Sequence, residues 1–358
     1  MIKEDELNSY LKKIQPIDHM AKRRIMLKEA NSLKISNSLG KLDIITKQVL
    51  AIKEDIDPHN FKKTIIVMAG DHGVANECVS VFKSNVTSKL LLKISEGKAP
   101  INAIANTIGA QLISIDMGVS DIISPHNNII NMKLGYSTNN ISQGPAMDRN
   151  TVIRGILSGI KLVSSNTIIN SSNILAVGEI GIGNTTSASA ITSFLCNISP
   201  DETVGQGTGI SIDAQKIKKD IVRKSLAINK INLEDPIDIL AKLGGYEIVG
   251  VVGIILGAAI NKIPIVIDGF ISSVAAFLAY KMSQAVSEYM IISHLSAEPG
   301  HKYIIRELKK SPLLDLGMRL GQASGAAFTL PLIESACAVY LKSATILESK
   351  IKAEDKNI

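Results

Sequence analysis

The chain has 358 residues, of which 46% are hydrophobic and 20% charged, as in ordinary globular proteins with a large core. Its net charge of +6 comes mainly from dispersed Lys, and aromatic residues make up only 4% of the chain. Because proteins that bind single-stranded nucleic acid stack bases on aromatic rings, this composition argues against a nucleic-acid partner.

The cysteines and the apolar segments indicate the compartment. Cys78, Cys196 and Cys337 are odd in number and far apart, which predicts neither a disulfide framework nor a zinc site. Residues 1–6 lack the apolar stretch of a signal peptide. The longest apolar run, residues 248–260, is too short to span a bilayer. We therefore expect a cytoplasmic protein with no membrane partner.

The order of predicted elements indicates the fold class. Residues 1 to about 55 are expected to be helical, because Leu7, Leu11 and Ile14 recur at helical spacing. Helical patterns such as 86–97 and 247–259 separate the strands that follow. The predicted strands are residues 63–68, 111–116, 173–177, 263–267 and 289–293. Strands that alternate with helices predict an α/β fold with a parallel sheet.

The strand ends share one feature, which is a glycine or serine beside an ionisable residue. It occurs at residues 70–73 (GDHG), 178–179 (GE), 268–269 (DG) and 293–294 (SH). Ligands bind outside the carboxyl ends of strands in open parallel sheets, so we expect these segments to meet at one cleft. A plainer alternative is that each segment serves only as a turn.

Two glycine-framed segments carry the functional argument. Residues 178–186 (GEIGIGNTT) follow a predicted strand, and residues 205–209 read GQGTG. Such a loop exposes backbone N–H groups at the start of a helix, which favours an anion. The spacing is neither the dinucleotide fingerprint nor the P-loop. The sequence predicts a phosphate cradle of another kind, with purely structural turns as the alternative.

The histidines give weaker signals. His72 is a candidate acid, base or phosphate contact, although a His in such a turn is often structural, and Asp71 could cap the next helix. His294 and His301 could in principle bind a metal, but their spacing matches no zinc pattern. No metal site is predicted.

Six motifs occur in a characteristic order along the chain, at residues 69–74 (AGDHGV), 178–186, 235–248 (ending LGGYEI), 268–272 (DGFIS), 293–301 (SHLSAEPGH) and 313–321 (LLDLGMRLG). In these motifs and their order, residues 15–340 resemble the nicotinate mononucleotide:5,6-dimethylbenzimidazole phosphoribosyltransferase family. The resemblance implies transfer of ribose 5-phosphate from nicotinate mononucleotide to a cobamide lower-ligand base. The anomeric carbon inverts to α and nicotinate is released. No cofactor is implied.

The resemblance also implies the architecture. It is a parallel Rossmann-like sheet with helices on both faces, in a large domain of residues 56–334. A small helical domain combines residues 1–55 with 335–358, and the enzyme is a dimer.

The family motifs assign roles to individual residues. The implied phosphate and ribose contacts are Gly181, Gly183, Asn184, Thr185, Gly207, Thr208 and Gly209, with Lys218 and Ser296 as nearby donors. The implied base pocket comprises Asp71, His72, Ser80, Lys83 and Ser84. Glu179 is implied to lie beside the reacting ribose.

Three departures from the family cluster around this site. The family's general base is a Glu in a Leu-Arg-Leu-Gly-Glu segment, but Gln322 stands there, and an amide cannot take up a proton near neutral pH. Gln206 replaces an Arg in the second glycine segment. Lys83 and Ser84 replace Pro-Gln in residues 79–87 (VSVFKSNVT).

Three explanations remain open. The chain is a working transferase that uses another base, such as Glu179, or a phenolic acceptor activated by Lys83. Alternatively, it is the silent partner of a homologous chain, as in two-subunit relatives that attach phenol or p-cresol. The third explanation is drift in an inactive homologue. Because the changes cluster while the glycines persist, the first two are favoured.

Overall fold

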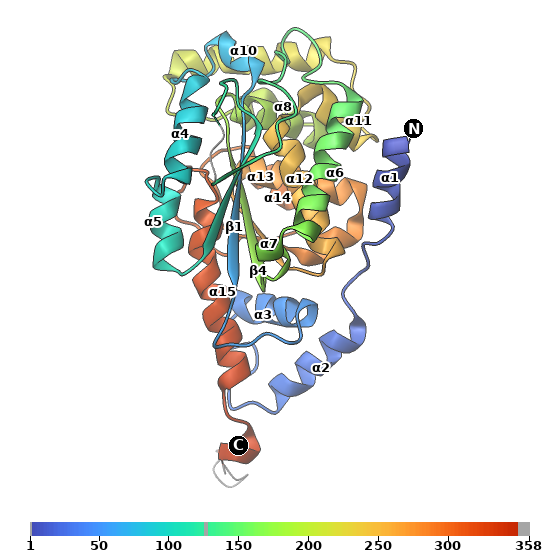
Figure 1. Ribbon diagram of the computed structural model, residues 1–358, viewed down its shortest axis with the longest axis vertical. Helices are drawn as coiled ribbons and strands as arrows, with labels where there is room; N and C mark the ends of the chain where they lie inside the picture. Colours follow the sequence, from blue (N-terminus) through green and yellow to red (C-terminus); the bar gives the residue numbers. More distant parts are fainter. Residues whose placement is uncertain (1, 125–127, 350–358) are drawn as a thin grey trace.

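The computed structural model describes residues 2–124 and 128–349, which form a six-stranded sheet with helices on both faces (Figure 1). The strand order is β3-β2-β1-β4-β5-β6, and every neighbouring pair is parallel. The strands are β1 (Lys63–Gly70), β2 (Gln111–Gly118), β3 (Ile129–Asn131), β4 (Ile174–Ile180), β5 (Ile265–Ile267) and β6 (Met290–Ile292). The predicted parallel α/β architecture is confirmed.

Helices lie before, between and after the strands in the chain. In chain order they are α1 (Ile2–Leu11), α2 (His19–Ala30), α3 (Lys41–Ile52), α4 (Asn85–Ser95), α5 (Pro100–Thr107), α6 (Arg149–Ser165), α7 (Thr167–Asn170), α8 (Asn184–Cys196), α9 (Pro200–Thr203), α10 (Ile212–Ile228), α11 (Pro236–Leu243), α12 (Tyr246–Ile260), α13 (Phe270–Met282), α14 (His301–Glu307), α15 (Ser324–Lys342) and α16 (Ile346–Ser349), with the 3-10 helices η1 (Gly73–Glu77) and η2 (Gln284–Tyr289).

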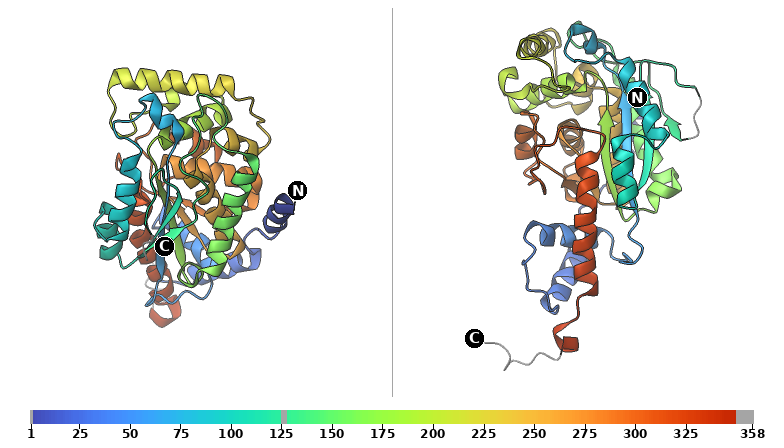
Figure 2. Two further views of the ribbon diagram at one scale, coloured as in Figure 1. Left: turned by 45° about the horizontal axis from the view of Figure 1, so that its top comes forward. Right: turned by 90° about the vertical axis from the view of Figure 1, so that its left-hand side faces the viewer.

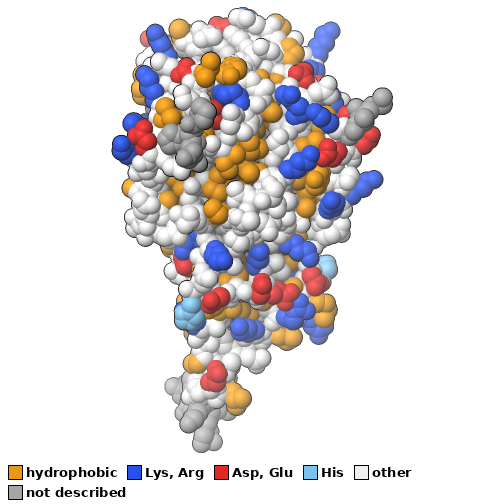
Figure 3. All heavy atoms as spheres, in the orientation of Figure 1, with side chains coloured by type: hydrophobic (Ala, Val, Ile, Leu, Met, Phe, Trp, Pro, Cys, Tyr) orange, Lys and Arg blue, Asp and Glu red, His pale blue; other side chains and the backbone are white. Residues whose placement is uncertain are grey.

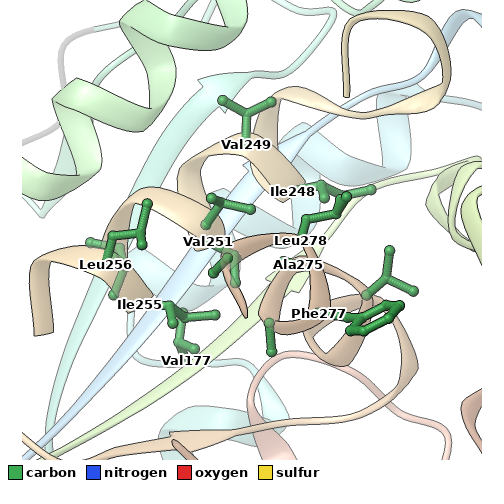
Figure 4. Packing of buried hydrophobic residues seen from close by; sticks show 14 of the residues in the cluster. Val177, Ile248, Val249, Val251, Ile255, Leu256, Ala275, Phe277 and Leu278 are labelled. Carbon is green, nitrogen blue, oxygen red and sulfur yellow. The ribbon is translucent and has the colours of Figure 1, made fainter. Parts of the chain in front are cut away.

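Alternation along the strands divides the core into two layers. Ile66 and Met68 of β1 face the layer of α6, α12 and α13, whereas Ile65 and Val67 face the layer of α4, α5 and α15. Side chains of α12 and α13 pack together beside Val177 of β4 (Figure 4). Successive side chains point to opposite sides of a strand, so strands buried on both faces read as continuous apolar runs.

The closest helix pair in the first layer depends on glycine. A Cβ atom at Gly159 of α6 would lie 2.8 Å from the backbone of Gly253 in α12. A Cβ atom at Gly253 would lie 2.4 Å from the carbonyl oxygen of Ile156. Neither backbone has room for a side chain, so these glycines allow the two helices to pack directly on each other.

Helices from the two ends of the chain meet below the sheet. Figure 2 shows α2 and α3 beside the lower part of α15, and both α2 and α15 contact α3. The remaining helix of the N-terminal segment, α1, packs instead against α6 and α12. The predicted domain boundaries stay a prediction; α15 runs through the second boundary, and residues 350–358 lie outside the described residues.

One described helix, α15, is long and apolar enough to cross a membrane by length and composition alone. Its 18-residue window is 56% buried, and the helix packs against α3, α5 and β4. Helices in the core of a soluble protein pass the same test, so α15 gives only weak evidence for a membrane span. On the face drawn in Figure 3, basic and acidic side chains are interspersed rather than separated.

Candidate active site

A cavity of about 350 Å³ opens at the carboxyl ends of the central strands. Strand order reverses between β1 and β4, which is where ligands bind in doubly wound sheets. The polar and charged lining residues are Ser80, Glu179, Asn184, Thr185, Thr208, Asp268, His294, Ser296, Glu298, Arg319 and Gln322. The predicted meeting of strand ends is thus observed for the segments that contain Glu179, Asp268 and His294.

The first glycine segment forms a helix N-terminus on the cavity wall. Gly181, Gly183, Asn184 and Thr185 all line the cavity, and α8 begins at Asn184. Gly183 has φ of +97°, a backbone conformation that side-chain-bearing residues rarely adopt. The dipole of α8 places its positive end at the cavity wall, which favours a bound anion.

The second glycine segment lies next to the first, since a Cβ atom on Gly207 would lie 2.9 Å from Oγ1 of Thr185. Gly207 and Thr208 line the cavity, but Gly209 does not. The N–H group of Gly207 donates to Oε1 of Glu298 at 2.8 Å, and its carbonyl accepts from Nη1 of Arg319 at 2.9 Å. Two side chains from distant parts of the chain therefore fix this loop.

Lys218 supports both glycine segments from behind. Its side chain is fully buried, and Nζ donates to Oγ1 of Thr185 at 2.7 Å. A Cβ atom on Gly207 would lie 3.1 Å from this nitrogen. Lys218 does not itself line the cavity. Burial lowers the pKa of the Lys218 ammonium to about 8, and the Glu298 carboxylate opposes that shift.

The protonation state of Lys218 predicts how anion binding depends on pH. Below about pH 8 the ammonium is charged and attracts a phosphate, and above that pH the charge is lost. We expect the affinity for ribose 5-phosphate to fall by about tenfold between pH 7 and pH 9.5, by titration calorimetry. A Lys218→Met variant should bind more weakly and show a flat profile. An unchanged pH dependence in that variant would contradict the assignment.

Glu179 is a buried carboxylate on the cavity wall. It is the second-last residue of β4 and is 4% exposed. The amide of Asn184 donates to Oε2, and no hydrogen bond is found to Oε1 within the described part of the chain. Burial raises the pKa of Glu179 well above its usual range, and the nearby Glu247 and Asp268 carboxylates add to the increase. A carboxylate with raised proton affinity suits a general base.

Gln322 lies beside Glu179 at the cavity. Its main-chain N–H donates to the Glu179 carbonyl at 3.0 Å, and its side chain lines the cavity while being only 5% exposed. Gly321, Gln322 and Ala323 are all left-handed, with φ of 73°, 59° and 60°. A Cβ atom on Gly178 would lie 2.2 Å from the Ala323 nitrogen, so this strained loop packs directly on β4.

An apolar wall completes the cavity on the side of α4. It consists of Val79, Phe82, Val86 and Leu90, with Ser80 at its edge. The Ser80 hydroxyl lies 3.1 Å from the Thr208 hydroxyl, which joins this wall to the second glycine segment. Such a surface suits a flat aromatic ring.

Four residues of the predicted base pocket lie away from the cavity. Asp71 and His72 are buried behind it, where Asp71 accepts hydrogen bonds from Thr87 and Ser120 and His72 pairs with Glu247 at 2.7 Å.

The other two residues that miss the cavity are Lys83 and Ser84. They lie in the turn before α4, whose first turns present Val86 and Leu90 to the cavity instead. An activating role for Lys83 at a phenolic acceptor therefore has no geometric support.

Ser296 lies on the cavity wall and is positioned by His301. Burial lowers the pKa of His301 to about 3, so its ring is neutral. Its Nδ1 accepts the Ser296 N–H at 2.9 Å, which leaves Nε2 to donate to the Ser273 hydroxyl at 2.8 Å. No group of three His, Cys, Asp or Glu that could hold a metal is found among the described residues.

Four of the polar or charged lining residues were given no individual role from the sequence, namely Asp268, His294, Glu298 and Arg319. Asp268 and His294 follow β5 and β6, so their place at strand ends was the available signal. Arg319 comes from a loop with no periodic pattern. Among the described residues that line the cavity, Arg319 is the only Lys or Arg.

This anion cradle beside an apolar wall, at the switch point of a parallel sheet, is the site of a phosphoribosyltransferase. A family model described as Phosphoribosyltransferase matches residues 14–351. The chain is 39% identical over 346 residues to the nicotinate-nucleotide–dimethylbenzimidazole phosphoribosyltransferase of Clostridium acetobutylicum, covering 97% of this chain and 98% of the relative. The Dehalococcoides mccartyi protein of the same name is 36% identical over 345 residues, covering 96% and 98%.

Solved structures agree with these sequence relationships. The crystal structure of CobT from Thermus thermophilus superposes with a TM-score of 0.87 at 31% identity, covering 93% of this chain and 99% of that chain. The chain belongs to the nicotinate-nucleotide–dimethylbenzimidazole phosphoribosyltransferase family.

Proposed function

We propose that this chain transfers the 5-phosphoribosyl group of nicotinate mononucleotide to an aromatic lower-ligand base, such as 5,6-dimethylbenzimidazole. The products are an α-ribotide and nicotinate. The observation that carries the proposal is one cavity in which a helix-terminal anion cradle, a buried carboxylate and an apolar wall lie together. The names of the relatives described above support this pair of substrates. We place the enzyme in the cytoplasm.

In this proposal the 5′-phosphate binds between the two glycine segments. The direct contacts are Gly181, Gly183, Asn184, Thr185, Gly207, Thr208 and Ser296, with Gly209 and Lys218 behind them. Arg319 is added to this set, because its guanidinium is anchored on the Gly207 carbonyl at the cavity wall. It supplies a positive charge on the loop that carries Gln206.

The reaction needs one proton to be removed. A nitrogen of the acceptor attacks the anomeric carbon, and the bond from that carbon to the pyridinium nitrogen breaks with its electron pair, so nicotinate leaves without an acid. The remaining N–H proton of the acceptor must be taken up by the enzyme or by water. We assign this role to Glu179, whose Oε1 has no hydrogen-bond partner within the described part of the chain and whose pKa is raised by burial.

A second candidate function follows from Gln322. The side chain at the family's general-base position is an amide, and its buried Oε1 has no hydrogen-bond partner among the described residues. In this alternative the chain is the catalytically silent subunit of a heterodimer, and a homologous chain that carries Glu at this position supplies the base, for a benzimidazole or for phenol or p-cresol. A homodimer is the arrangement expected for an enzyme active by itself.

Release of nicotinate from nicotinate mononucleotide separates the two candidates. The purified chain is assayed alone, with dimethylbenzimidazole and with phenol in separate runs. We expect turnover with dimethylbenzimidazole, because an azole nitrogen already carries a free electron pair for the attack. Silence with both acceptors would refute Glu179 as a sufficient base and favour the two-subunit alternative.

A further inference from the structure

The buried side chain of Asp71 is connected to the phosphate loop through one intermediary. Its Oδ1 accepts the hydroxyl proton of Thr87 at 2.5 Å. The Thr87 oxygen in turn accepts the main-chain N–H of Ile182 at 3.1 Å. Thr87 is 2% exposed and Asp71 is fully buried, so neither contact is weakened by solvent.

The direction of these hydrogen bonds is fixed. An N–H group can only donate, so the Thr87 oxygen must accept from Ile182, and its own proton is free to go to Asp71. The other carboxylate oxygen of Asp71 accepts the N–H and the hydroxyl of Ser120, at 2.8 and 3.0 Å. With both oxygens engaged by donors, Asp71 holds the Thr87 hydroxyl in one orientation.

Ile182 is the point at which the phosphate loop is held. It lies between Gly181 and Gly183, which have no side chains to anchor them. Its N–H is bound to Thr87, and its carbonyl accepts the N–H of His72 at 3.3 Å. A fixed Ile182 therefore presents the loop and the start of α8 in one geometry.

The same contact joins the two halves of the cavity. Thr87 lies in the first turn of α4, next to Val86, which belongs to the apolar wall. Ile182 belongs to the anion cradle. Hence the segment expected to hold the acceptor ring and the loop expected to hold the phosphate share one buried hydrogen bond.

We propose that Asp71 and Thr87 are positioning residues that hold the phosphate-binding loop through Ile182 and align it with the acceptor wall. This inference rests on the placement of the phosphate in the proposed function. It gives the Asp-His turn after β1 a role, although these side chains do not reach the cavity. Preorganised donors bind a ligand more tightly because less ordering is required on binding.

The experiment measures ribose 5-phosphate binding by titration calorimetry, so its outcome does not depend on catalysis. Thr87→Val keeps the shape of the side chain but removes the hydroxyl, and we expect about a tenfold weaker dissociation constant. Thr87→Ser retains the hydroxyl and should restore binding to within about threefold. Ser88→Ala is the matched control. The hydroxyl of Ser88 donates to the Asn85 carbonyl in the same helix and to Asp121, and neither of these partners belongs to the phosphate loop.

If the inference is correct, Thr87→Val binds ribose 5-phosphate weakly, whereas Thr87→Ser and Ser88→Ala bind it about as well as the unmodified chain. The melting temperatures of Thr87→Val and Ser88→Ala should be equal. Where the unmodified chain turns over, KM for nicotinate mononucleotide should rise more than kcat falls. Unchanged binding by Thr87→Val, or equal losses in Thr87→Val and Ser88→Ala, would overturn it. Failure of the unmodified chain to bind ribose 5-phosphate would also overturn the inference. If the unmodified chain binds ribose 5-phosphate but releases no nicotinate, only the proposed reaction is contradicted.

Discussion

A Glu179→Gln variant is expected to release nicotinate with a kcat about 100- to 10,000-fold below that of the unmodified chain. The amide keeps the size of the side chain and can still accept a hydrogen bond from Asn184. It cannot take up the proton of the acceptor. Affinity for nicotinate mononucleotide should change little, because the carboxylate acts on the proton rather than on the phosphate.

The pH profile gives the sharper test. A general base is active only when deprotonated, so kcat of the unmodified chain should rise with pH through the pKa of Glu179, which burial places above the usual carboxyl range. The rise should be absent in Glu179→Gln. Glu298→Gln is a suitable control, since Glu298 also lines the cavity but holds the Gly207 N–H. A Glu179→Gln variant that retains kcat to within about threefold would remove Glu179 from the mechanism.

The second large effect is expected from Gln322→Glu. It places a carboxylate at the position to which the family resemblance assigns the general base, and we expect kcat with dimethylbenzimidazole to rise by about ten- to hundredfold. In a Glu179→Gln background the same change should restore activity, because one carboxylate would then replace the other. Nicotinate release by the four chains of this double-mutant cycle provides the measurement.

A Gln322→Met variant controls for side-chain size and should show no gain. If Gln322→Glu restores nothing in either background, residue 322 is not the missing base. A silent chain that remains silent with Glu at position 322 would direct attention to a homologous partner subunit.

The sheet was predictable because its central strands are buried on both faces. The runs at residues 63–68 and 111–116 are extended by two residues each in β1 and β2, since the strand conformation continues into the terminal glycines. The edge strand β3 was missed because Ile129–Asn131 has only three residues, none fully buried. Short edge strands carry too little hydrophobic pattern to be distinguished from loops.

The cavity was predicted in outline but not in every residue. The glycines of residues 178–186 mark the anion cradle directly, because the chemistry they provide is local to the backbone. Asp71 and His72 adjoin a strand end in the same way, yet their side chains turn inward to Thr87 and Glu247. Those partners lie 16 and 175 residues away in the sequence, and no local pattern reveals them.

The left-handed loop before α15 does not depend on the side chain at position 322. Its backbone is held by hydrogen bonds from Gln322 N–H to Glu179 and from Ser324 N–H to Gly321, and by close packing on Gly178. None of these contacts uses the side chain at position 322. An exchange of amide and carboxylate at position 322 would therefore leave the backbone contacts of the loop in place, so the proton chemistry of the cavity can change without rebuilding the surrounding fold.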